Sequence, residues 1–212
     1  MPGQDKAAAP GQLAGNQYFD RIFGCEAVKV LPGEYFASDR GMVLVTVLGS
    51  CVAACIRDPE RRIGGMNHFM LPQSANGESA LPSASARYGA HAMQLLLERL
   101  VQLGARRDKL EAKVFGGGRV MASLASSQVG DHNARFVLRF LASEGIRLAA
   151  QDLGDIYPRK VYFFPVEGRV LVKKLISMQN DTVASREREY EARLRLEPAS
   201  SDFDAPSLGQ RS

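Results

Sequence analysis

The chain has 212 residues, 45% of them hydrophobic, which is enough for one domain with a core of its own. Its 27 Lys and Arg against 23 Asp and Glu give a net charge of +4, spread along the chain without the aromatic-interleaved basic stripe of nucleic-acid binders. The chain has only three cysteines, which excludes a disulfide scaffold. It shows no signal-peptide pattern and no apolar stretch of membrane-spanning length, so we expect neither an exported protein nor a membrane-embedded one. We expect a cytoplasmic protein with no nucleic-acid partner.

Residues 1–17 are rich in Ala, Gly, Pro and Gln and carry few large apolar groups, so we expect a flexible N-terminal arm. The folded domain is predicted to span residues 18–180. Within it, "EAVKVLPGEYFAS" and "GMVLVTVLG" predict strands, and "CVAACIRDPERRIGGMNHFMLP" predicts two more, joined by a turn at Asp58-Pro59. Cys51 then lies where one extended run ends.

Two helices follow these strands. The first begins near Ser83 and ends at Gly104, with one apolar stripe formed by Ala90, Met93, Leu96, Leu97, Leu100 and Val101. The second is predicted to begin at Asp131, as its N-cap, and to end at Gly145. Its inner face is formed by Phe136, Val137, Phe140 and Leu141.

The remaining apolar runs read as strands. "KLEAKVFGGGRVM" is a short strand running into glycines, and "IRLAAQDLG", "KVYFFPV" and "GRVLVKKL" follow, the last two forming a hairpin at Glu167-Gly168. This order predicts an α/β (α+β) fold, a layered sandwich with a β-sheet core and flanking helices.

The C-terminal part, residues 181–212, contains "SREREYEARLRLEP", in which Arg and Glu alternate at helical spacing. This pattern predicts a solvated helix, with a docking helix for another protein as the alternative. The composition after Pro198 predicts a disordered tail.

Cys51 and His68 are the main candidates for chemistry. A cysteine attacks as the thiolate, which a neighbouring histidine can generate, and a turn at Gly49-Ser50 would expose backbone N–H groups able to hold an oxyanion. The alternative is an ordinary buried pair, because "CVAACI" resembles core sequence. Strand alternation places His68 on the face of Met66, opposite to Asn67.

The residue types also allow two other kinds of site. Cys51, Cys55, His68 and His91 could in principle bind a metal, but no second Cys/His pair stands at zinc-site spacing, so we expect no metal. "FGGGR" lacks the ending of a P-loop, so its glycines are expected to let the backbone pass close to a neighbouring strand or a substrate.

"LGSCVAACIRDPERRIGGMNHFMLP", residues 48–72, closely resembles the signature of the chemoreceptor glutamine deamidase family, CheD. The resemblance continues through "KVFGGGRVM" and "EGIRLAAQDLGDIYPRKVYFFPVEGRVLVKKL", and so covers about residues 27–175. It implies a layered α/β fold similar to that of toxins that deamidate glutamine. It also implies hydrolysis of glutamine side chains to glutamate on methyl-accepting chemotaxis receptors, without a cofactor.

The resemblance also assigns residues. Cys51 matches the nucleophile, His68 the base and Thr46 the third catalytic residue, and we expect the sulfur and the ring nitrogen to lie within or slightly beyond hydrogen-bonding distance. The residues expected to bind substrate are Ser50, Gly65, Asn67, Gly116, Gly117 and Arg119. A CheC-type phosphatase is a further partner that the family implies. The alternatives are a non-catalytic adaptor for receptors or that phosphatase, and a cysteine hydrolase acting on another acyl group, such as receptor glutamate methyl esters.

Overall fold

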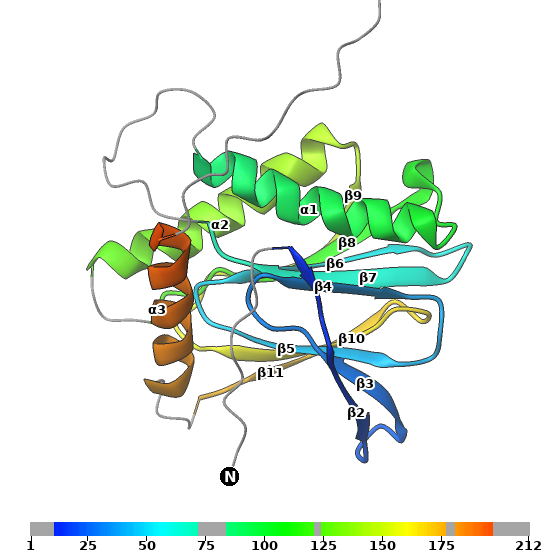
Figure 1. The fold of residues 1–212 in the computed structure, drawn as a ribbon, viewed down its shortest axis with the longest axis horizontal. Coiled ribbons are helices and arrows are strands. Elements are labelled where there is room, and N and C mark those ends of the chain that lie inside the picture. Colours follow the sequence, from blue (N-terminus) through cyan, green and yellow to red (C-terminus); the bar gives the residue numbers. More distant parts are fainter. Residues whose placement is uncertain (1–10, 72–83, 121–123, 177–180, 197–212) are drawn as a thin grey trace, which may run out of the picture.

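The computed structural model describes residues 11–71, 84–120, 124–176 and 181–196. Two mixed β-sheets lie face to face, and two long helices cover the outer face of the larger sheet (Figure 1). The strands in chain order are β1 Gln12–Leu13, β2 Asn16–Asp20, β3 Cys25–Lys29, β4 Glu34–Ser38, β5 Val43–Leu48, β6 Val52–Asp58, β7 Ile63–Phe69, β8 Glu111–Gly116, β9 Arg147–Leu153, β10 Arg159–Phe164 and β11 Arg169–Lys174. The helices are α1 Ala84–Gln102, the short η1 Arg107–Lys109, α2 Leu124–Ser143 and α3 Asp181–Leu196.

The six-stranded sheet has the order β1-β4-β7-β6-β8-β9, and the five-stranded sheet has the order β11-β10-β5-β3-β2. The predicted α/β sandwich is therefore confirmed, as are the β6–β7 and β10–β11 hairpins. At the second hairpin, Gly168 has a φ of +72°, a conformation that glycine adopts without strain.

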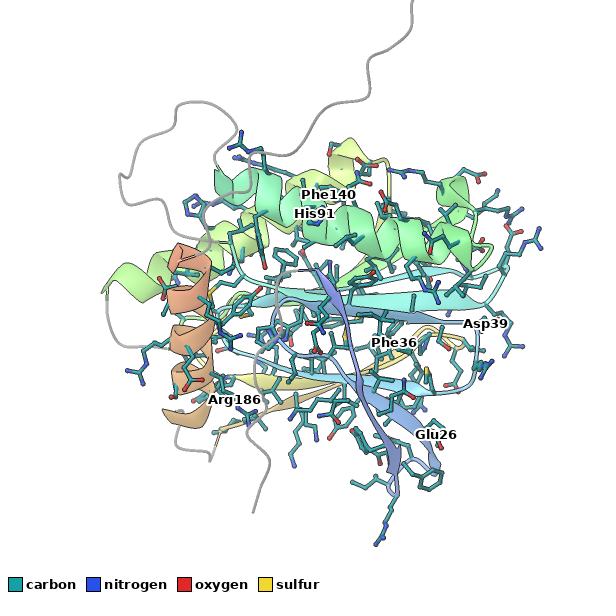
Figure 2. The ribbon with its side chains drawn as sticks, viewed as in Figure 1. Glu26, Phe36, Asp39, His91, Phe140 and Arg186 are labelled. Carbon is teal, nitrogen blue, oxygen red and sulfur yellow. The ribbon has the colours of Figure 1, made fainter. Side chains whose placement is uncertain are left out.

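Alternation along the strands divides the buried side chains between two main cores. The core between the six-stranded sheet and the helices includes Val52, Phe69 and, on α2, Phe140 (Figure 2). The core between the two sheets includes Cys51, Ala53 and Met66, with the partly buried Phe36 packed against it (Figure 2). Helix α3 stands across one end of both sheets (Figure 1), so the end of this inter-sheet layer is where α3 meets the strands.

Two predictions about the first two long helices are corrected by the structure. Val101 is 45% exposed, because it lies about 80° around the helix from the central Met93 at 100° per residue, at the margin of the stripe. Helix α2 begins at Leu124, so Asp131 lies within it and forms an ion pair with Arg119 instead of capping the helix.

The two ends of the folded part also differ from prediction. Strand β1 pairs with β4, strand β2 pairs with β3, and Ala14 is buried, so residues 12–17, which were predicted as part of a flexible arm, lie in the folded part. Residues 1–10 and 197–212 lie outside the described residues. Helix α3 is not solvated all round, because Glu187, Tyr190 and Leu194 are buried. None of the described helices is long and apolar enough to cross a membrane.

Candidate active site

The candidate site is built on segment 49–51, which connects β5 in one sheet to β6 in the other. Its three carbonyl groups are all anchored. The backbone N–H of Gly118 donates to the carbonyl of residue 49, and that of Gly117 to the carbonyl of residue 51, both at 2.7 Å. Asn133 Nδ2 donates to the carbonyl of Ser50 at 2.8 Å. Because the peptide unit is planar, fixing the carbonyls of residues 49 and 50 also fixes the direction of the N–H groups of Ser50 and Cys51.

These N–H groups converge on a single acceptor, the carboxylate of Glu187 on α3. Its Oε1 accepts from the N–H of Gly49 at 3.0 Å and from that of Cys51 at 3.1 Å. Its Oε2 accepts from the N–H of Ser50 at 3.0 Å and from the Ser50 hydroxyl at 2.7 Å. The segment therefore forms a nest of N–H donors at Cys51 that holds one carboxylate.

The glycines after β8 allow this arrangement. Gly116 has a φ of +107°, and a Cβ at this position would lie 2.1 Å from the Cys51 carbonyl oxygen. Gly117 has a φ of +63°, and a Cβ there would lie 2.9 Å from the carbonyl oxygen of Gly130. Both positions need glycine for conformation and space, and this lets the backbone of residues 116 and 117 lie against segment 49–51 and Gly130.

His68 lies on β7 with its ring between the two sheets. The Thr46 hydroxyl donates to the carbonyl of Val30 at 2.7 Å and lies 2.8 Å from His68 Nδ1. Since the hydroxyl hydrogen is used by Val30, the Thr46 oxygen accepts from Nδ1–H. This tautomer leaves a lone pair on Nε2, and Nε2 is buried with no hydrogen-bond partner among the described residues. His68 is thus prepared to accept a proton at Nε2.

Cys51 and His68 face the same side of the six-stranded sheet. In the β6–β7 register His68 pairs with Ala53, and Cys51 precedes Ala53 by two residues on the same face, which makes Cys51 a diagonal neighbour of His68. The hydrogen bond between Sγ and Nε2 is not formed, because Nε2 has no partner among the described residues. The cysteine instead lies beside the Glu187 carboxylate.

Electrostatics keep this pair neutral in the described structure. Burial, and next the Glu187 carboxylate, raise the pKa of the Cys51 thiol well above its ordinary value. Burial lowers the pKa of His68 to about 4, against a weaker opposing effect of the Val30 carbonyl. A thiol and a neutral imidazole are the protonation states that precede general-base activation of a cysteine.

Three of the residues predicted to bind substrate lie elsewhere. Asn67 faces α1, where its side chain donates to the Ala92 carbonyl at 3.1 Å, and Gly65 faces the same way, with Leu96 2.7 Å from a would-be Cβ. Arg119 is on the surface, in an ion pair with Asp131 at 2.8 Å. The structure brings together Cys51, His68, Thr46, Ser50, Gly116 and Gly117.

Sequence reasoning missed Asn133 and Glu187. Asn133 is fully buried and ties two loops together, because its Oδ1 accepts from the N–H of Leu71 while its Nδ2 donates to Ser50. An asparagine on the inner stripe of a predicted helix, two positions after Asp131, was the signal that could have indicated it. Glu187 was obscured by the alternating charges around it.

A cavity of about 540 Å³ adjoins the site. Thr46 and His68 line it from the sheets, and Val183, Arg186 and Glu187 line it from α3, with Arg186 labelled in Figure 2. In the described part of the chain no group of three or more His, Cys, Asp or Glu side chains could hold a metal ion.

Comparison with known proteins gives a consistent result. The family described as CheD chemotactic sensory transduction matches residues 70–174. A protein of Dechloromonas aromatica named probable chemoreceptor glutamine deamidase CheD 1 is 58% identical, over 91% of this chain and 94% of that protein. A protein of Methylobacillus flagellatus named probable chemoreceptor glutamine deamidase CheD is 54% identical, over 91% of this chain and 96% of that protein.

Among solved structures, the crystal structure of Bacillus licheniformis hypothetical protein YfiH aligns with 67% of this chain and 62% of its own, at 14% identity and a TM-score of 0.35. A likeness this weak supports no conclusion about function.

Proposed function

This chain belongs to the CheD family, and we propose that it deamidates glutamine side chains of chemoreceptors through a thioester on Cys51. Its activity is that of a protein-glutamine glutaminase, which converts glutamine and water into glutamate and ammonia. The observation that carries the mechanism is the nest of three N–H groups on segment 49–51, next to a cysteine and on the same sheet face as a histidine oriented by Thr46.

The proposed reaction uses each of these groups in turn. His68 Nε2 takes the proton of the Cys51 thiol, and the thiolate attacks the carboxamide carbon of the substrate glutamine. The N–H groups of segment 49–51 hold the oxyanion, in the place where a Glu187 oxygen now lies. The imidazolium then protonates the departing ammonia. Water, activated by neutral His68, hydrolyses the thioester and releases glutamate.

Thr46 acts through His68. By accepting from Nδ1–H it holds the ring in the tautomer whose Nε2 can receive a proton. Asn133 and the two glycines that follow β8, Gly117 and Gly118, act through the backbone, because they fix the carbonyls of the nest. We therefore propose Cys51 and His68 as the catalytic residues and Thr46 as their positioning residue.

The relatives' names point to chemoreceptors, and we propose methyl-accepting chemotaxis receptors as the substrates, modified on their cytoplasmic helical regions. This substrate places the enzyme in the cytoplasm, where its three cysteines stay reduced. A CheC-type phosphatase is a further proposed partner, on family resemblance.

The test is mass spectrometry of a receptor cytoplasmic fragment after incubation with the full-length protein. The wild-type protein should convert glutamine to glutamate, and Cys51→Ser should abolish the conversion. Cys25→Ser is the matched control, since Cys25 is a half-buried free cysteine on β3, outside the site. Conversion that persists in Cys51→Ser, or that is lost equally in Cys25→Ser, would refute the mechanism.

A further inference from the structure

Helix α3 covers the nest completely. All three N–H groups of segment 49–51 and the Ser50 hydroxyl donate to Glu187, whose side chain is only 3% exposed. Three backbone donors and one hydroxyl therefore hold this carboxylate. A buried carboxylate held in this way occupies an anion site rather than a surface salt bridge.

The helix is docked along one face. Glu187, Tyr190 and Leu194 stand at positions i, i+3 and i+7, and all three are buried. The Tyr190 hydroxyl forms a hydrogen bond with that of Tyr88 on α1, and it lies 2.8 Å from where a Cβ of Gly33 would stand. By contrast Glu189, two positions after Glu187, is exposed. This face therefore delivers one carboxylate to the nucleophile and anchors it with an aromatic and an aliphatic contact.

The chemistry of this contact matches the product of the reaction. Deamidation of a helix-borne glutamine leaves a glutamate whose carboxylate lies at Cys51, with one oxygen in the oxyanion nest. Glu187 is a glutamate on a helix with its carboxylate in that place. We propose that α3 occupies the site of the substrate helix, with Glu187 as an intramolecular product mimic, so that a receptor helix must displace α3 before turnover. This inference rests on the proposed deamidase function.

Two features of Cys51 agree with an occupied site. Its side chain has no exposed surface, so no substrate carboxamide can reach the sulfur while α3 is docked. Burial, and next the neighbouring carboxylate, raise the pKa of the thiol, so the docked enzyme holds little thiolate. The docked face also describes the preferred substrate: a helix with an outward-facing glutamine followed, three and seven residues later, by side chains that fit the contacts of Tyr190 and Leu194.

The sharpest test makes the mimic into a substrate. In the full-length Glu187→Gln variant the new carboxamide lies at Cys51, and the enzyme should hydrolyse it. Sγ bonds to the amide carbon as the C–N bond breaks and ammonia leaves, and water then cleaves the thioester to regenerate a glutamate and the thiol. Conversion should be first order and independent of protein concentration.

Mass spectrometry of a chymotryptic digest follows this conversion, because arginines at 186 and 188 make the tryptic fragment too short. The double variant Glu187→Gln with Cys51→Ser should keep the amide. Glu189→Gln, which makes the same change at an exposed position of the same helix, should also keep its amide. Both controls separate catalysis from spontaneous deamidation.

A second measurement does not depend on deamidase activity. Opening the site in Glu187→Ala should raise the rate at which iodoacetamide modifies Cys51, read by peptide mapping, at least ~10-fold, since both access and thiolate fraction increase. Glu189→Ala should react at the wild-type rate. The Glu187→Ala variant should also deamidate a receptor fragment faster than wild type, with thermal unfolding confirming that both variants are folded.

The outcomes separate the two proposals. An amide at position 187 that persists, together with wild-type rates of alkylation and receptor deamidation in Glu187→Ala, would overturn the product mimic and leave the deamidase intact. Faster alkylation in Glu187→Ala without deamidation of any substrate would overturn the proposed function, while α3 would still be shown to cover the site.

Discussion

Replacing Thr46 by valine tests how the histidine is oriented. Valine has nearly the same shape as threonine, and the side chain is only 1% exposed, so Thr46→Val exchanges a hydroxyl for a methyl group with little repacking. It removes the acceptor 2.8 Å from His68 Nδ1 and leaves only the Val30 carbonyl, at 3.4 Å, to satisfy that N–H. The ring then loses the contact that fixes both its tautomer and its angle.

The magnitude follows from that lost contact. A buried donor left with one long, weak contact costs about 1–3 kcal/mol. If this cost applies fully in the transition state, where Nδ1–H must stabilise a charged ring, kcat falls about 5- to 150-fold, at roughly 1.4 kcal/mol for each factor of ten. KM should change little, because Thr46 lies behind His68 and not on the substrate nest.

The assay is the rate of glutamine conversion on a receptor fragment at several substrate concentrations, with thermal unfolding in parallel. Thr46→Ser keeps a hydroxyl within reach of Nδ1 and should recover most of kcat. A Thr46→Val variant with wild-type kcat would refute the argument, and so would a Thr46→Ser variant as impaired as the valine, since both would show that the hydroxyl does not orient His68.

Three further predictions concern stability and pH. Gly117→Val should lower the melting temperature as well as activity, because a φ of +63° costs a residue with a Cβ about 1–2 kcal/mol. The close contact of the new Cβ with the Gly130 carbonyl oxygen adds to this cost. An unchanged melting temperature would contradict the argument. Asn133→Leu should lower the free energy of unfolding by about 2–4 kcal/mol in chemical denaturation, since it removes one buried donor and one buried acceptor, and a loss below the experimental error would show that neither bond matters. Burial lowers the pKa of His68 from 6.5 to about 4, so between these pH values the unfolded chain binds a proton that the folded chain does not. The free energy of unfolding should therefore fall as the pH drops through this window, by roughly 3 kcal/mol at most. His68→Gln should make this fall smaller. An identical pH dependence in wild type and His68→Gln would exclude His68 as its source.

The sequence was informative wherever a local pattern decides the structure. The alternation in "GGMNHFM" places His68 with Met66 and opposite to Asn67, and the structure agrees, with Met66 between the sheets and the Asn67 side chain facing α1. The same alternation excludes Gly65 and Asn67 from the face of His68, so their assignment to the substrate site conflicted with a pattern already visible in the chain. The alternation of the strand therefore predicted the facing of these residues correctly, whereas their closeness to His68 in sequence did not.

The glycines after β8 show what local patterns leave open. "FGGG" predicts close approach of backbone to something, with a neighbouring strand or a substrate as the candidates. In the structure the glycines approach the backbone next to a neighbouring strand. Gly117 and Gly118 donate to carbonyls of segment 49–51, which precedes β6 and lies more than sixty residues earlier in the chain. That choice depends on β6 pairing with β8, a tertiary register that neither segment encodes alone.

Glu187 was the hardest residue to predict, and the reason is physical. In "SREREYEARLRL" Glu187 and Glu189 stand directly beside arginines and Glu191 has an arginine four residues later, so charge pairing predicts a solvated helix and gives no glutamate priority. One weak signal distinguishes Glu187: Tyr190 and Leu194 are large apolar side chains that share one helical face with it. An apolar face of this kind indicates that the helix packs against another part of the protein. What that face meets lies 136 residues earlier at Cys51. A nest of backbone donors has no side-chain signature, so the acceptor that fills it becomes visible only when the fold brings both segments together. In the proposed site, the nest that would hold a substrate carboxamide is filled by a carboxylate of the same chain.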